Sequence, residues 1–216
     1  MNSLMMEYIL LIILWIIWCI IHSSMISLTV TGYLKKRLGS YYKFYRLFFN
    51  LFALATLIPL ILYSLSLRDR VLFRWEGSMI IIQIALLIIV LSLFITGALK
   101  YDMLRFLGIR QIKSGKSFST LSESGDIDTS GVLGITRHPW YLGAIIFIWI
   151  YYREMYVSTL LVNIILTVYL LIGTVLEERK LIIKFGDKYR DYRKKVSMLF
   201  PAKWIVSKLL KDEWAH

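Results

Sequence analysis

An arginine, a histidine and a proline stand together immediately before an apolar stretch, in "TRHPWYLG" (residues 136–143). Pro139 is best accommodated at the first position of a helix, because its missing N–H would have had no partner there. Arg137 and His138 then lie at the helix entrance, beside the unpaired N–H groups and the positive dipole end of the first turn. Gly143 would let another group approach closely. The stretch predicts a site for a carboxylate or a phosphate.

Two adjacent glutamates, Glu177 and Glu178, end the next apolar stretch. A carboxylate pair is unfavourable at a helix C-terminus. Successive helical residues point about 100° apart, so we expect one of the two to face the cleft. A short turn near residues 153–154 makes the two helices antiparallel, which brings this carboxylate to the same membrane face as Arg137. The pattern predicts either a site for both ends of a zwitterion, such as an amino acid, or a buried salt bridge between the helices.

The elements that position these groups are apolar helices. The chain has 216 residues, of which 58% are hydrophobic, and its mean hydropathy is +0.64, which indicates a polytopic membrane protein. A bilayer span needs about 20 apolar residues. Five windows meet or approach this length, and they predict an all-α, polytopic integral membrane helical bundle. The windows are residues 8–28, 47–67, 78–99, 139–152 and 157–176, the fourth being short.

The net charge of +12 is distributed unevenly between the two sides of this bundle. Five basic residues lie in 29–46, six in 99–138 and eleven after Leu176, against four in the loops of the other side. The positive-inside rule then predicts an external N-terminus and a cytoplasmic C-terminus. We expect the protein to lie in the inner membrane. Topology and contact with anionic membrane lipids account for the charge, so we expect no nucleic-acid partner.

Two amphipathic helices are predicted on the cytoplasmic side after the last span. One apolar face combines Leu181, Phe185, Tyr189, Tyr192 and Val196, and the Gly186–Asp187 pair predicts a break within it. The final stretch, residues 201–214, carries aromatic and aliphatic residues among lysines, which suits a helix in the headgroup layer. No repeat or long linker divides the chain, so we expect one domain over residues 1–216.

The segment "RHPWYLG", followed by "EERKLIIKFGDKYRDYRKKV" and Pro201, resembles the C-terminal signature of a superfamily of membrane methyltransferases. It includes isoprenylcysteine carboxyl methyltransferases and phospholipid methyltransferases, and the similarity covers residues 131–201. The resemblance implies S-adenosylmethionine as the methyl donor. It implies a donor site at the cytoplasmic face, with Arg137 toward the acceptor. The cofactor-binding residues would be Gly131, His138, Pro139, Tyr141, Leu142, Gly143, Glu177 and Glu178.

The N-terminal half is similar to bacterial methanethiol S-methyltransferases and to NnrU-like membrane proteins, in "IIHSSMIS", "YRLFFNL" and "LGIRQ". This similarity implies S-methylation of a small or lipophilic thiol. His22, Arg110 and Gln111 would then bind the acceptor together with Arg137. The catalytic residues would be Arg137, Glu178 and His22. An interhelical hydrogen bond is an equally good explanation of His22.

Other acceptors and roles remain open at this point. The same signature fits a carboxyl methyltransferase of isoprenylcysteine-like substrates, a phospholipid amine N-methyltransferase, and a non-catalytic accessory membrane protein. No metal is expected, because His22, His138, His216 and Cys19 do not form a ligand set at a standard spacing. Methyl transfer from a sulfonium needs chiefly alignment of donor and acceptor and a deprotonated nucleophile.

Overall fold

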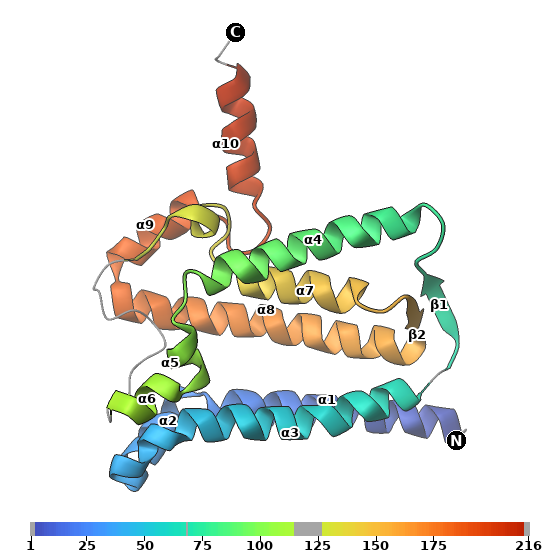
Figure 1. The fold of residues 1–216 in the computed structure, drawn as a ribbon, viewed down its shortest axis with the longest axis horizontal. Helices are drawn as coiled ribbons and strands as arrows, with labels where there is room; N and C mark the ends of the chain where they lie inside the picture. The colour runs from blue at the N-terminus through green and yellow to red at the C-terminus, as the bar shows by residue number, and fades with distance from the viewer. Residues whose placement is uncertain (1–2, 68, 115–126, 214–216) are drawn as a thin grey trace. The chain divides into compact units, whose positions relative to one another are not determined.

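The computed structural model describes residues 3–67, 69–114 and 127–213, and helices dominate it (Figure 1). Contacts within the chain define two compact units, each assembled from three separated stretches. The described part of the first unit is 3–67, 69–75, 102–114 and 153–169; that of the second is 76–101, 127–152 and 170–213. The prediction of one domain over the whole chain stays a prediction.

The first unit contains two long apolar helices and the beginning of a third. Its core is formed by Leu11, Trp15, Leu60 and Val162. The Trp15 indole also donates a hydrogen bond to Ser64 Oγ at 2.9 Å, which satisfies a polar group inside an apolar region. The elements are α1 (Ser3–Met25), α2 (Leu28–Leu38), η1 (Gly39–Phe44), α3 (Tyr45–Ser66), β1 (Val71–Arg74), α5 (Met103–Leu107), α6 (Ile109–Ser114), β2 (Glu154–Tyr156) and the start of α8 (Val157–Phe185).

A small antiparallel sheet departs from the purely helical expectation. β1 pairs with β2, with Val71 opposite Tyr156 and Arg74 opposite Glu154. The Asp69 carboxylate accepts hydrogen bonds from the first N–H groups of α8, at Val157 (2.9 Å) and Ser158 (3.0 Å). A carboxylate there is favoured by the helix dipole, so this loop fixes where α8 begins.

The second unit packs two apolar helices, α4 (Met79–Ala98) and α7 (Pro139–Ile150), against each other. A Cβ at Gly97 would lie 2.4 Å from Trp140 Nε1, and a Cβ at Gly143 would lie 3.1 Å from a ring carbon of Phe94. Glycine at both positions therefore permits the close approach. The unit also contains η2 (Gly131–Gly134), the remainder of α8, α9 (Asp187–Lys195) and α10 (Ala202–Glu213).

In the part of the chain that the structure describes, four helical segments are long and apolar enough to cross a membrane: Ser3–Met25, Leu28–Ser66, Met79–Ala98 and Val157–Phe185. The protein is therefore an integral membrane protein, and the all-α polytopic bundle is confirmed. The fourth predicted window forms α7, whose 12 residues reach about 18 Å, short of a bilayer core of about 30 Å. Gln83 Nε2 of α4 donates to the last carbonyl of α7, Ile150 O, at 2.7 Å, which satisfies this helix end among apolar residues. The orientation of the termini stays a prediction.

Candidate active site

The predicted helix start at Pro139 is confirmed: Pro139 is the first residue of α7 and His138 directly precedes the helix. The residues before it are held in an extended conformation by the tail that follows α9. Thr136 forms a parallel bridge with Ser197, Arg137 N donates to Ser197 O at 3.0 Å, and His138 N donates to Met198 O at 3.2 Å. The two halves of the sequence signature are thus hydrogen-bonded to each other through the backbone.

Glu178 lies at the centre of a buried ionic cluster. Arg137 grips its carboxylate with two parallel bonds, Nε to Oε1 and NH2 to Oε2, both 2.9 Å long. His138 Nε2 lies 2.9 Å from Oε1, and Arg193 Nε lies 2.8 Å from Oε2. Glu178 and His138 are only 3% and 2% exposed. Charge-assisted bonds of this bidentate kind are strong and directional, so the cluster fixes the orientation of the Arg137 and His138 side chains.

The short helix α9 closes the cluster from the other side. Tyr189 Oη donates to Glu178 Oε1 at 2.6 Å, and Tyr192 Oη donates to Leu133 O at 2.5 Å. Burial and the bonded Glu178 carboxylate raise the pKa of Tyr189, so its phenol stays a donor at physiological pH. Gly186, at a φ of +58°, separates α8 from α9. The break at this glycine and the apolar face containing both tyrosines are as predicted.

The NH1 group of Arg137 is directed to backbone. It donates to Arg193 O at 3.3 Å and to Val196 O. The positive group at the beginning of α7 and the carboxylate of α8 therefore do meet, but they bind each other. The prediction that the two glutamates end their helix is wrong, because α8 continues to Phe185. The sequence predicted either a site for a zwitterion or a buried salt bridge, and the Arg137–Glu178 pair forms the buried salt bridge. Both groups are already neutralised before any ligand arrives.

The adjacent carboxylate, Glu177, is placed differently. It is half-buried, and in the described parts of the chain no side chain hydrogen-bonds to it or pairs with it. One turn earlier on the same face of α8, Gly173 lies against the Tyr141 ring, where a Cβ would be 3.3 Å from Cε1. Burial, and then the nearby Glu177 charge, raise the pKa of Tyr101 to about 12. Glu177 thus offers a carboxylate beside two tyrosines, Tyr141 and Tyr101.

Three other residues expected at the methyl-donor site, Gly143, Leu142 and Gly131, have structural roles in the fold. Gly143 is buried where α7 meets Phe94 of α4. Leu142 continues the first turn of α7, and its N–H donates to His138 O at 3.0 Å. Gly131 begins η2 with a φ of +61°, a conformation that favours glycine. These glycines are thus explained by helix packing and chain reversal.

His22, Arg110 and Gln111 belong to the first unit. The His22 ring stacks on Trp18 with centroids 4.9 Å apart, and lies 4.9 Å from Phe49 and 6.2 Å from Tyr169. Gln111 is buried and donates to Arg105 O at 2.9 Å. Within the described residues, His22 Nδ1 and Gln111 Oε1 are buried without a hydrogen-bond partner.

The third of these residues, Arg110, pairs with Asp102 at 2.7 Å. The structure therefore gives the three expected acceptor-binding residues three different environments. His22 is enclosed by aromatic rings, Gln111 is buried beside the backbone, and Arg110 forms an ion pair on the surface.

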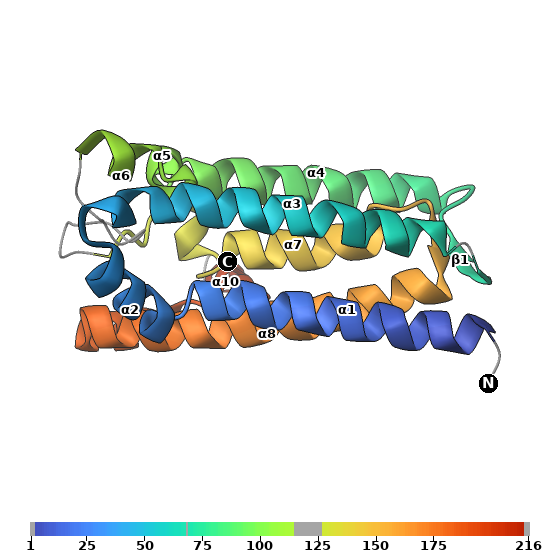
Figure 2. The same cartoon turned by 90° about the horizontal axis from the view of Figure 1, so that it is seen from below.

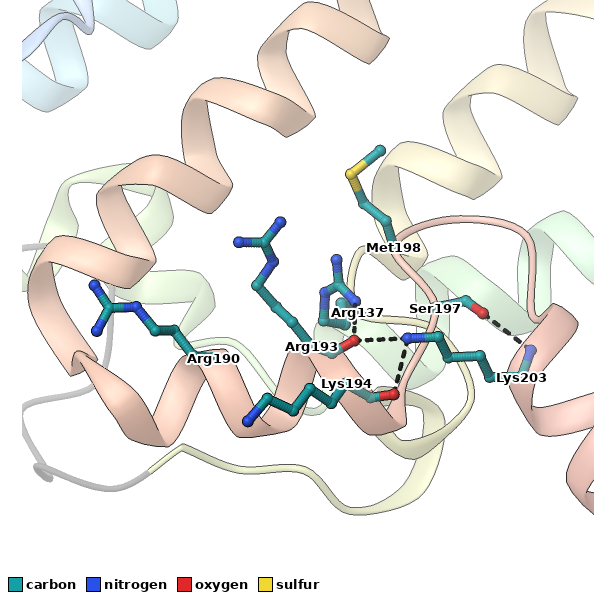
Figure 3. Close-up of a pocket in the computed structure, with 7 residues that line it drawn as sticks. All are labelled: Arg137, Arg190, Arg193, Lys194, Ser197, Met198 and Lys203. Atoms are coloured by element: carbon teal, nitrogen blue, oxygen red, sulfur yellow. Dashed lines mark hydrogen bonds between the residues drawn. The ribbon is translucent and has the colours of Figure 1, made fainter.

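A basic hollow of about 600 Å³, not expected from the sequence, opens beside the ionic cluster (Figure 3). Arg193 contributes to both, since it lines the hollow and pairs with Glu178. The many Lys and Arg residues in 188–195 indicate a basic surface, but the sequence alone does not show which of these side chains line one hollow. The lining residues are Arg137, Arg190, Arg193, Lys194, Ser197, Met198 and Lys203.

Comparison with known families identifies the chain. The NnrU protein family matches residues 10–202, which include the ionic cluster and the helices of both units apart from the start of α1 and α10. The chain belongs to the NnrU protein family. This membership, together with the relatives described next, confirms the resemblance to membrane methyltransferases.

Relatives of known activity match shorter segments. A methanethiol S-methyltransferase of Pseudomonas deceptionensis is 44% identical over 78 residues, 36% of this chain and 29% of that protein. One from Mycobacterium tuberculosis is 45% identical over 65 residues, 30% of this chain and 26% of that protein. A protein-S-isoprenylcysteine O-methyltransferase of Schizosaccharomyces pombe is 35% identical over 99 residues, 42% of this chain and 41% of that protein. The matches thus cover less than half of each relative, and no solved structure matches the chain.

Proposed function

We propose that this protein is an integral membrane methyltransferase that uses S-adenosylmethionine to S-methylate a small or lipophilic thiol, with its active site at the cytoplasmic face of the inner membrane. The observation that carries the proposal is the 44% and 45% identity to methanethiol S-methyltransferases. Membership of the NnrU protein family over residues 10–202 supports it. Bound S-adenosylmethionine would supply an electrophilic methyl group.

Glu177 is the carboxylate that we assign to the methyl donor. Glu178 is neutralised by Arg137, with His138, Tyr189 and Arg193 also bonded to it, so a further cation would have to displace one of them. Glu177 has no such partners among the described residues and can receive an ammonium group. Tyr141 and the beginning of α7 would form the adjoining wall of this site. Glu178 is then a positioning residue, which holds Arg137 and His138 where α7 begins.

The acceptor thiol must lose its proton as the new carbon–sulfur bond forms and the carbon–sulfur bond of the donor breaks. We assign the proton to His22, because its Nδ1 is buried and has no partner in the described chain. Trp18, Phe49 and Tyr169 around it suit a soft thiol sulfur. Arg110 and Gln111 would complete the acceptor site.

Donor binding by the purified protein tests the assignment of the two glutamates. We expect saturable binding of S-adenosylhomocysteine by calorimetry, at least ten-fold weaker affinity in Glu177→Gln, and an unchanged unfolding temperature in that variant. Glu178→Gln should lower the unfolding temperature as well as donor binding. Absence of saturable binding by the intact wild-type protein would refute the proposed function. Unchanged binding by Glu177→Gln would refute only the role of Glu177.

Product analysis tests the thiol assignment. Membranes supplied with methanethiol and S-adenosylmethionine should release dimethyl sulfide into the headspace. The Schizosaccharomyces pombe relative supports a second candidate, methylation of an isoprenylcysteine carboxyl group. With a donor labelled on its methyl group, a thiol acceptor gives volatile label and a prenylated acceptor gives label that extracts with lipid. Donor binding without turnover of either acceptor would favour a non-catalytic accessory role.

A further inference from the structure

The basic hollow carries more positive charge than its surroundings neutralise. Five of its lining residues are cations, and among the described side chains three carboxylates contact them. Arg190 pairs with Asp187, and Lys194 pairs with Asp191, on the exposed side of α9. The Lys203 ammonium instead donates to two backbone carbonyls, Arg193 O and Lys194 O, both at 2.8 Å (Figure 3). The hollow is therefore suited to an anion.

The helix that carries Lys203 leaves an apolar face uncovered. Along α10, Val206, Leu209 and Leu210 lie on one side and are 52%, 61% and 51% exposed. Ser207 and Lys208 lie on other faces of the same helix. This separation of apolar from basic residues is typical of helices that lie in the headgroup region of a bilayer. Trp214, which the sequence placed on this helix, lies outside the described residues.

The direction of α10 fits such a location. Within the second unit, α10 runs across the direction of the apolar helices α4 and α7 (Figure 1). Figure 2 shows it end-on, next to the beginning of α7. Because α4 is long and apolar enough to span a membrane, a helix that crosses its direction near one end lies along the membrane surface.

We propose that α10 and the basic hollow form a binding surface for anionic phospholipids. The hollow receives the lipid phosphate between Arg190, Lys194 and Lys203, and the apolar side of α10 inserts among the adjoining acyl chains. Lys203 links the two parts, since it belongs to α10 and also lines the hollow. The inference uses no part of the proposed methyl transfer, because none of these three cations is assigned to donor or acceptor.

Lipid binding to the full-length protein tests the hollow. In phosphatidylcholine nanodiscs, binding of a fluorescent phosphatidylglycerol should be saturable and weakened by salt. Each basic residue near an anionic lipid surface strengthens binding about five-fold, so R190Q/K194Q should weaken it by about twenty-five-fold. The matched control, K35Q/K36Q, removes two exposed lysines of α2 in the first unit and should have no effect.

Three outcomes would overturn the proposal. Equal loss in both double variants would indicate general electrostatic attraction rather than a site. Displacement of the lipid by millimolar glycerophosphate or inorganic phosphate would assign the hollow to soluble anions. Displacement by S-adenosylhomocysteine would assign the hollow to the methyl donor. Thermal unfolding of both double variants verifies that they are folded.

Membrane insertion of α10 is measured independently with an environment-sensitive dye. The single native cysteine allows L209C and S207C to be labelled in a C19A background. These positions are two residues apart and lie on nearly opposite sides of α10. In phosphatidylglycerol nanodiscs the dye at position 209 should shift to the blue relative to detergent, while the dye at 207 should not. Equal spectra at both positions would refute insertion of the apolar side.

Discussion

Each of the two units buries a polar group that the sequence marks for chemistry, and the two groups are treated in opposite ways. In the second unit Glu178 is bonded by Arg137, His138, Tyr189 and Arg193. In the first unit His22 is surrounded by aromatic rings, and its Nδ1 has no partner among the described residues. The Glu178 carboxylate is therefore fully hydrogen-bonded by its neighbours. His22 Nδ1 can still form a hydrogen bond with a bound molecule.

This difference distinguishes a residue that positions other side chains, Glu178, from one that is available to react, His22. Buried charges are costly unless they are paired and hydrogen-bonded, so the Glu178 cluster is explained by the need to join α7, α8, α9 and the tail. A buried imidazole nitrogen without a partner has no such structural explanation. We therefore expect changes at Glu178 to act mainly on folding, and changes at His22 to act mainly on turnover.

The largest effect is expected from Glu178→Gln. It leaves the Arg137 guanidinium buried without its counter-charge, and breaking a buried pair in this way costs about 3–5 kcal/mol. Unfolding in detergent micelles, followed by heat or denaturant, should show this loss. Glu177→Gln, one residue away, is the matched control and should change stability by less than about 0.5 kcal/mol. Equal stabilities of the two variants would contradict the structural role of Glu178.

A smaller loss is expected when only one donor to the cluster is removed. Tyr189→Phe deletes the hydrogen bond to the Glu178 carboxylate, and bonds to charged groups contribute about 1.5–3 kcal/mol. Tyr192→Phe deletes the bond to the neutral Leu133 carbonyl, which contributes about 0.5–1.5 kcal/mol. Both phenols are buried on the same face of α9, so the pair is closely matched. If unfolding showed Tyr192→Phe to be the more harmful change, the cluster would not depend on its charge.

His22→Phe tests whether the histidine of the first unit acts in the reaction. Phenylalanine preserves a planar ring between Trp18 and Phe49, so the change in stability should stay within about 1 kcal/mol. Methylation of a thiol acceptor should fall by at least 100-fold, since general-base catalysis contributes about 10²–10⁴-fold, while donor binding is retained. A fully active His22→Phe variant would show that the histidine only packs.

Much of the framework follows from local patterns in the sequence. Apolar windows identified the long helices because the bilayer demands length and hydrophobicity alone. Pro139 marked the beginning of α7, and Gly186 marked the break before α9. The face containing Leu181, Tyr189 and Val196 followed from helical periodicity. Each of these features depends on residues close together in the chain.

Features that depend on long-range packing could not be derived in this way. The pairing of β1 with β2 joins residues about 80 positions apart, and nothing in either short strand identifies its partner. Periodicity placed Tyr189 on a buried face but could not show that Glu178 accepts its hydrogen bond. Gly143 suggested room for a ligand, whereas the ring of Phe94 on α4 occupies that side. The partner of a side chain is set by tertiary packing, which one sequence does not specify.

The smallest effect is expected at an exposed ion pair, which supplies a third environment for the comparison. Asp128 accepts hydrogen bonds from Ser130 and Lys100. These bonds, of which the one from Ser130 has the largest effect, lower the pKa of Asp128 from 3.8 to about 2. A lowered folded-state pKa stabilises the fold above pH 4, and the contribution is lost as the pH falls from about 4 to about 2. Because the side chain is 52% exposed, solvent screening limits the effect to a few tenths of a kcal/mol, as for surface pairs generally. In Asp128→Asn, the fall in the free energy of unfolding between about pH 4 and pH 2 should be smaller by that amount. If Asp128→Asn lost as much stability as Glu178→Gln, burial would not determine how much each carboxylate contributes to stability.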